Sequence, residues 1–144
     1  MNIFEALRED HDRQRTLVEL LTKTQGDSEG RREIFERLKR ELEEHAAAEE
    51  RAFYIPLIEE DMTQDKARHS IAEHQEIDEL IAELEETDRS SAAWLSTAQK
   101  LKDKVTHHLD EEEREVFQMA GKVLSEQQKT ELAEDYQKEM PAAK

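Results

Sequence analysis

A repeat constrains the fold of this chain more than any other feature of its sequence. Two histidines and a glutamate are matched, 63 residues later, by the same residue types in the same order. Flanking residues match at this offset as well, such as Leu38 with Leu101. We therefore expect two similar halves to converge on one site. The matched sets are His11, His45 and Glu49 in the first half and His74, His108 and Glu112 in the second.

The composition favours helices. Charged residues make up 40% of the 144 residues, hydrophobic residues make up 35%, and there are only three Gly and two Pro. This length suits one domain with a single core, and this composition suits long helices rather than a sheet. A partly disordered acidic chain is the alternative, but the regular spacing of apolar residues argues against it. We predict an all-α protein.

Capping patterns set three of the expected helix starts, because an N-cap side chain accepts a hydrogen bond from the backbone three residues on. Another boundary comes from Pro56, which disfavours helical geometry in the residue before it. The capping pairs are Asn2 with Glu5, Asp61 with Gln64 and Ser125 with Gln128. The expected helices cover about residues 2–24, 29–54 and 61–86, a fourth from the 87–91 loop to about Gly121, and a short fifth over about 125–138.

Short loops between the four long helices favour antiparallel neighbours. We therefore predict an antiparallel up-down four-helix bundle with a short C-terminal helix. Residues 1–121 are assigned to the bundle, and residues 122–144 to the short helix and a tail packed on or near it. Because the short helix is polar, we expect it to pack on the end of the bundle rather than to join the site.

Helix periodicity indicates that the repeated residues point inward, because positions three, four and seven apart share one face. In the second helix, His45 and Glu49 continue an apolar line that begins with Leu38 and Leu42. Each of the other long helices also places a histidine on an apolar line. These lines are Phe4, Leu7, His11 and Val18; Ile71, His74, Ile77 and Ile81; and Leu101, Val105, His108 and Glu112.

Inward histidines and glutamates predict a metal site. The i, i+4 spacing of His45 with Glu49, and of His108 with Glu112, places each pair about 6 Å apart along one face. Buried carboxylates are costly unless they are paired or bind metal, and no Lys or Arg is placed on these faces. Mixed nitrogen and oxygen ligands suit iron, manganese or zinc better than calcium or magnesium. The chain has no Cys, which excludes thiolate ligands.

Residues beside the repeated set have plainer interpretations. Glu50 and Glu113 follow the matched glutamates by one position, so they are expected to be solvated or to hydrogen-bond a ligand. Tyr54 and Phe117 match at the repeat offset and could shield the site, although aromatic residues at helix ends more often only pack.

The remaining histidines are weaker candidates as ligands. His107 points about 100° away from His108 and is expected on the surface. His69 lies five residues before His74, about 140° around the helix. No histidine has a glutamate three residues before it, and this disfavours a ferritin-like di-iron site.

The charge of the chain limits its partners. A net charge of −16 argues against nucleic acid and anionic membranes. The N-terminus lacks the basic start and apolar run of a signal peptide, and no run of about 18 apolar residues occurs. We therefore expect a cytoplasmic protein. No extra heptad seam marks a dimer face, so the oligomeric state stays open.

Together these residues resemble the hemerythrin-like, or HHE cation-binding, family over about residues 4–120. The resemblance implies an antiparallel four-helix bundle that holds an oxo-bridged non-haem di-iron centre. By matching position, the four repeated histidines would be terminal ligands, and Glu49 and Glu112 would bridge two iron ions. The motifs that carry it are Glu9-Asp10-His11, His45-Ala-Ala-Ala-Glu49-Glu50, Glu73-His74 and His108-Leu-Asp-Glu-Glu112-Glu113.

The chain departs from the oxygen-carrying members of this family, which use a fifth histidine four residues from the one in the third helix. Here Ser70 and Asp78 occupy the positions four residues from His74. Asp78, His69 or a water molecule would then fill the fifth-histidine position. This departure puts reversible oxygen carriage in doubt and leaves room for an additional labile site.

The resemblance implies a small-molecule partner, namely O2, peroxide or nitric oxide. The leading hypothesis is a di-iron protein that binds one of these molecules without a separate catalytic side chain. A second hypothesis is an enzyme that decomposes peroxide or reduces nitric oxide at the same centre. A third is an iron store, or a sensor of iron or oxygen, that performs no turnover.

Overall fold

Helices account for most of the residues that the structure describes. The computed structural model describes residues 1–141, and within that range there is no strand, so the all-α prediction is confirmed. No helix in the same range is both long and apolar enough to cross a membrane. The elements are α1 (Ile3–Thr22), α2 (Glu29–Glu49), η1 (Glu50–Tyr54), α3 (Ile55–Ile58), α4 (Gln64–Glu86), α5 (Ala92–Glu111), η2 (Glu112–Val116), α6 (Phe117–Val123) and α7 (Glu126–Glu139).

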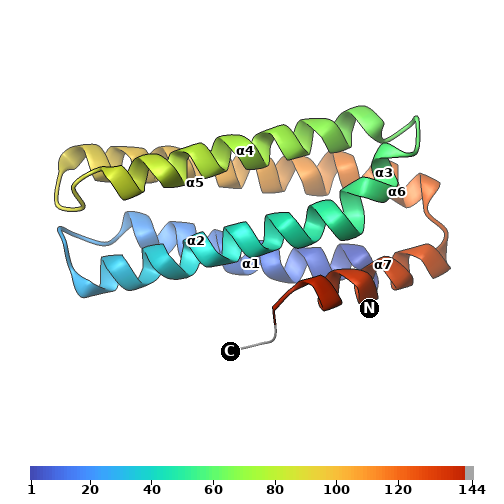
Figure 1. Cartoon of the computed structure of the whole chain (residues 1–144), viewed down its shortest axis with the longest axis horizontal. Coiled ribbons are helices and arrows are strands. Elements are labelled where there is room, and N and C mark those ends of the chain that lie inside the picture. The colour runs from blue at the N-terminus through green and yellow to red at the C-terminus, as the bar shows by residue number, and fades with distance from the viewer. Residues whose placement is uncertain (142–144) are drawn as a thin grey trace.

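The long helices lie side by side in two layers along one axis (Figure 1). One layer contains α1 and α2, and the other contains α4 and α5, with the chain reversing direction at each end. Helix α1 packs against α2 and α5, and α4 packs against α5. Helix α7 lies along the outside of α1, next to the N-terminus. Over its whole length, α7 therefore lies along the side of the long helices.

The second long helix continues past Pro56, so the prediction that it ends near Tyr54 is wrong. Its α-helical part gives way to the π-helical segment η1, in which the Ile55 N–H donates to the carbonyl of Glu50, five residues earlier. Proline is tolerated in the first turn of a helix, where its missing N–H is not needed. Helix α3 begins directly after the π segment, and Pro56 lies in the first turn of α3. The hydrogen-bond register therefore shifts just before the proline.

The fourth long helix contains a matching irregularity. Segment η2 follows α5, and the Phe117 N–H donates to the carbonyl of Glu112. Helix α6 then runs to Val123, two residues beyond the predicted end at Gly121. Single π turns inside α-helices are frequent at functional sites. Here η1 begins one residue after Glu49, and η2 begins at Glu112.

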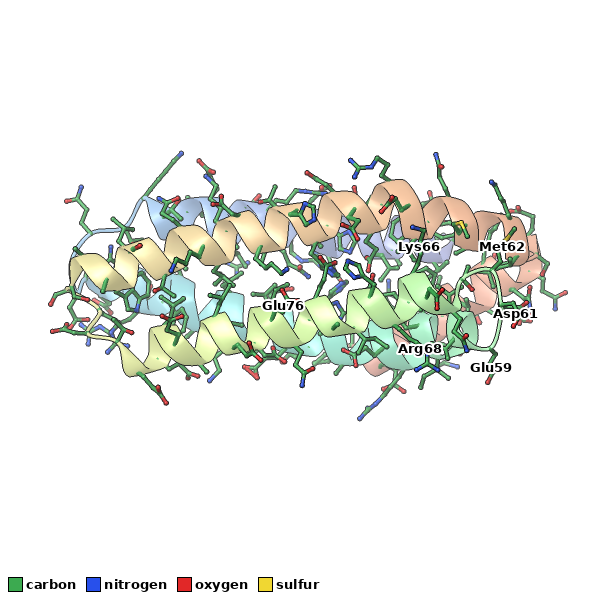
Figure 2. All side chains as sticks on the ribbon, turned by 90° about the horizontal axis from the view of Figure 1, so that it is seen from above. Glu59, Asp61, Met62, Lys66, Arg68 and Glu76 are labelled. Atoms are coloured by element: carbon green, nitrogen blue, oxygen red, sulfur yellow. The ribbon has the colours of Figure 1, made fainter. Side chains whose placement is uncertain are left out.

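Two of the three predicted capping pairs are confirmed. Reciprocal capping boxes are formed by Asn2 with Glu5 and by Ser125 with Gln128. The third prediction is wrong, because α4 begins after Thr63 and Asp61 stays in the preceding loop (Figure 2). The Thr63 hydroxyl is buried and donates to the Leu57 carbonyl at 2.6 Å, which ties this loop to α3.

The apolar core has two parts. One part surrounds the N-terminal end of α1, the segments η1 and α3, and the inner face of α7, with Leu7 and Phe53 among its residues. The other part surrounds the far ends of the long helices and includes Leu38 and Trp94. Along α1, His11 lies between Leu7 of the first part and Leu17 of the second. A layer of polar residues therefore divides the core.

Candidate metal centre

All six repeated residues meet in the layer between the two parts of the core. Helix α1 carries one, α2 carries two, α4 and α5 carry one each, and Glu112 begins η2. Each is buried, with no more than 6% of its surface exposed. The structure thus joins four helices that are far apart in sequence at one point. The residues are His11, His45, Glu49, His74, His108 and Glu112.

The six side chains divide into two overlapping groups of four. Within each group, one nitrogen or oxygen atom from every residue lies within 4.8 Å of the others. Both groups contain Glu49 and Glu112, and each adds two histidines. Two cations that share two carboxylates would use this arrangement. The first group adds His11 and His45, and the second adds His74 and His108.

The polar atoms at the centre lack hydrogen bonds. Both carboxylate oxygens of Glu49 and of Glu112 are buried without a hydrogen-bond partner in residues 1–141. The same holds for the Nε2 atoms of three histidines, which are His11, His45 and His108. A buried polar group without a partner destabilises the fold by about 1–3 kcal/mol. Bound cations would satisfy all of these atoms together, so the donor set fits a metal centre.

The opposite ring nitrogen of each histidine already has a partner, and this sets the tautomer. His11 Nδ1 lies 2.6 Å from Glu113 Oε2, and His74 Nδ1 lies 2.9 Å from Glu50 Oε2. When Nδ1 donates its proton to a carboxylate, Nε2 presents only a lone pair to the centre. His11 Nε2 is 3.0 Å from Glu112 Oε1, a contact between two acceptors unless a cation or a proton lies between them.

The partners of the other two histidines show how the halves differ. His108 Nδ1 lies 2.9 Å from Glu73 Oε1. His45 Nδ1 lies 2.6 Å from the hydroxyl of Tyr136. That hydroxyl in turn donates to Asp10. Tyr136 is 1% exposed and belongs to α7, so the expectation that the C-terminal helix stays outside the site is wrong.

The sequence contained part of the signal for these partners. Glu50 and Glu113 were expected to be solvated or bonded to a ligand, and both hydrogen-bond a repeated histidine. Tyr136 was missed, because it lies 126 residues from Asp10 and outside the repeat. Its only local signal is that it shares the buried face of α7 with Ala133.

Burial dominates the electrostatics of the centre. Loss of hydration, followed by the negative charge of Glu49, raises the pKa of Glu112 well above its usual value. Burial acts in the same direction on Glu49, but its contacts with His45 and His74 outweigh burial and lower its pKa. Burial also lowers the pKa of His11 to about 4, despite the hydrogen bond that its Nδ1 donates to Glu113. In the absence of metal, these shifts favour an ionised Glu49 beside a protonated Glu112, with His11 neutral.

Aromatic rings cover the centre from the side of α3 and α6. The Phe117 ring stacks on His11, with centroids 5.9 Å apart and an interplanar angle of 18°. Tyr54 lies 5.7 Å from the ring of His74 and is fully buried. Both rings therefore contact ligand candidates, as the shielding interpretation of the sequence expects.

A small cavity reaches the centre from the opposite side. Its volume is about 10 Å³, and three of the repeated histidines line it, together with Asp78. Asp78 is exposed to solvent where it lines this cavity, and it belongs to neither group of four. His69 is 57% exposed and faces Glu73 and Glu111 instead of the centre. The remaining lining residues are Gln14, Leu42, Ala46 and Ile77.

Known proteins share both the sequence pattern and the fold. The family model of the hemerythrin HHE cation binding domain matches residues 2–120. A crystal structure of a hemerythrin HHE cation binding domain-containing protein from Mycobacterium kansasii is similar, with a TM-score of 0.86 and 24% sequence identity over 96% of this chain and 84% of that one. At this identity the similarity concerns the fold. No curated protein matches the chain.

Proposed function

The chain belongs to the hemerythrin HHE cation-binding family, and from this premise we propose that it holds two iron ions and binds O2, peroxide or nitric oxide beside them. Glu49 and Glu112 would bridge the ions, and each ion would take two of the four buried histidines. The observation that carries this proposal is the pair of overlapping ligand groups that share both glutamates. Iron, when bound, supplies the redox chemistry that these side chains lack.

The residues around the centre would serve distinct purposes. Carboxylates at Glu50, Glu73 and Glu113 orient the histidines and keep Nε2 free for metal. Phe117 and Tyr54 exclude water from one side. A buried and dry site strengthens each electrostatic contact within it.

The cavity limits which molecules reach the metals. A volume of about 10 Å³ holds roughly one water molecule, so only molecules of a few atoms would fit without moving side chains. Gln14 lines this cavity, and its buried Nε2 has no hydrogen-bond partner among residues 1–141. An amide donor aimed at the cavity would stabilise a bound molecule that carries negative charge.

Iron per chain, measured by elemental analysis together with the absorption spectrum of the same sample, tests the proposal. Protein made with iron supplied should contain about two irons per chain. His108→Ala removes a ligand from one ion only, so it should lower the iron content and change the spectrum. His107→Ala is the matched control, because its side chain is 62% exposed and contacts Glu111 outside the centre. Full iron content in His108→Ala contradicts the ligand assignment.

Storage of iron is the weaker alternative. The buried ligand groups account for two cations, and the cavity beside them has no room for a mineral core. A sensor that reports iron occupancy would use the same two ions. Steady oxygen evolution from added peroxide, lost in His74→Ala, would indicate an enzyme, whereas bleaching without turnover would favour binding alone.

A further inference from the structure

A second group of histidines and glutamates lies between α4 and α5, outside the buried centre. His69 precedes Glu73 by four residues on α4, and His107 precedes Glu111 by four residues on α5. This is the spacing of His45 with Glu49 in the centre itself. Two side chains four residues apart on a helix lie on one face, close enough to serve one cation.

The atoms of three of these residues are placed as metal ligands would be. His69 Nε2 lies 2.9 Å from Glu111 Oε1 and 3.6 Å from Glu73 Oε2, and all three atoms lie within 4.8 Å of one another. Ligand distances of about 2.0–2.2 Å put neighbouring ligand atoms about 3 Å apart. His107 Nε2 lies 3.0 Å from the other oxygen of Glu111 and holds that carboxylate in place.

Glu73 connects this group to the buried centre. Its side chain is only 4% exposed, and Oε1 accepts the hydrogen bond from His108. Oε2 lies 3.6 Å from His69 Nε2 and 3.9 Å from Lys104 Nζ. One oxygen of Glu73 therefore faces the buried centre, and the other belongs to the group formed with His69 and Glu111.

Neighbouring lysines make their closest contacts with other carboxylates, and the group is open to solvent. Lys104 forms an ion pair with Glu76, and Lys66 lies 3.8 Å from Glu115. Lys66 and Glu76, both labelled in Figure 2, belong to α4 on either side of His69 and Glu73. A pocket of about 180 Å³ is lined by His69 and Glu111 and gives a cation access from outside.

We propose that His69, Glu73 and Glu111 form a separate surface site for one divalent transition-metal cation, such as Zn²⁺ or Co²⁺. One imidazole and two carboxylates suit these ions, and three protein ligands leave positions for water. The site shares Glu73 with the buried centre, because the same carboxylate accepts from His108. It lies one side chain away from a ligand of the buried metals.

Zn²⁺ titration of the iron-loaded protein by calorimetry tests this site. The wild-type chain should bind one Zn²⁺ beyond its iron. His69→Ala and Glu111→Gln each remove a ligand on the surface, so each should weaken this binding at least about tenfold. Glu115→Gln is the control, because it removes an acidic charge from the same pocket without removing a ligand. The affinity of this variant for Zn²⁺ should stay within about twofold of the wild type, as expected for a partly exposed charge that is not a ligand.

The result separates this site from the proposed function. Iron content is measured before Zn²⁺ is added, and neither His69 nor Glu111 belongs to the buried groups, so an iron-free protein would contradict only the buried centre. The surface site is overturned if the wild type takes up no additional Zn²⁺, or if His69→Ala binds it as tightly as the wild type. Co²⁺ in place of Zn²⁺ gives a second readout, because loss of the imidazole changes its visible absorption.

Discussion

Asp10 and Glu73 occupy equivalent positions in the two halves of the bundle, yet only Glu73 reaches a buried histidine directly. Each immediately precedes a repeated histidine on its own helix. Glu73 Oε1 is 2.9 Å from His108 Nδ1, whereas Asp10 Oδ2 is 3.7 Å from His45 Nδ1. Aspartate is one methylene shorter, and the hydroxyl of Tyr136 occupies the gap that this leaves.

Tyr136→Phe should therefore weaken the metal site without unfolding the protein. The ring stays to pack on α1, but His45 loses the partner that fixes its tautomer. Loss of such a partner usually lowers metal affinity by about 10–100-fold. Competition with a chelator of known affinity, monitored by the absorption of the iron centre, measures the change.

A double variant tests the reason for this effect. Asp10→Glu combined with Tyr136→Phe gives the first half the same carboxylate that the second half uses, so it should recover much of the lost affinity. Unchanged affinity in Tyr136→Phe would show that the phenol only packs. If the single variant is impaired and the added glutamate gives no recovery, the equivalence of the two halves fails.

Glu112→Gln should have opposite effects on the metal-free and metal-loaded proteins. In the metal-free protein, burial and Glu49 raise the pKa of Glu112, so the folded state binds more protons than the unfolded state. The stability cost of this residue grows as pH rises above the usual glutamate value of about 4.5. Replacement of this ionisable carboxyl group by a neutral amide should raise the free energy of unfolding at pH 7 by about 1–2 kcal/mol.

Urea unfolding in the presence of a chelator measures this gain, and Glu115→Gln serves as a control at a partly exposed position outside the centre. The same Glu112→Gln substitution should reduce the bound iron, because it removes a carboxylate that both ligand groups share. A less stable metal-free Glu112→Gln protein at pH 7 would show that the two buried glutamates do not repel each other.

Much of the fold followed from local rules in the sequence. Asn2 and Ser125 mark helix starts because their capping partners lie three residues away. The boundary at Pro56 did not follow, because no local motif marks the π-helical register shift that places the proline in the first turn of α3. Asp61 failed as a cap for a related reason: the buried hydroxyl of Thr63 ties the loop to α3 and places the start of the helix.

The site was predictable to the extent that the repeat encodes it. Residues of the repeat point inward because they share helix faces with apolar residues, and the structure brings all six together. Contacts that depend on long sequence separation were not predictable. Tyr136 meets His45 only because α7 folds back along α1. The sequence indicates Glu73 only as the neighbour of His74, and no spacing rule connects Glu73 with His108.

Gln14→Leu should weaken the binding of a small molecule while leaving the iron content unchanged. The substitution keeps the bulk of the side chain but removes the buried amide that lines the cavity. A hydrogen bond to a charged group contributes about 1.5–3 kcal/mol, so affinity for nitric oxide or peroxide at the loaded centre should fall at least about tenfold. Stopped-flow measurement of the dissociation rate provides the comparison. Equal rates in both proteins would mean that Gln14 does not contact the bound molecule.

In the metal-free protein, His11 should remain neutral to a much lower pH than an ordinary histidine. Burial lowers its pKa from 6.5 to about 4, and the hydrogen bond with Glu113 only partly opposes this. An unfolded chain takes up the proton near pH 6.5, while the folded chain does not. The stability that depends on this residue is therefore fully present above pH 6.5 and falls as pH drops towards 4, by up to about 3 kcal/mol.

An NMR titration of the imidazole signals, with metal removed by a chelator, observes this group directly. The His11 signal should shift with a midpoint near pH 4. Glu113→Gln removes the one carboxylate that favours the charged imidazole at Nδ1, so this variant should lower the midpoint further. A His11 midpoint near 6.5 in the wild type would mean that the metal-free centre opens to water, and the buried arrangement of ligands would then depend on the metal itself.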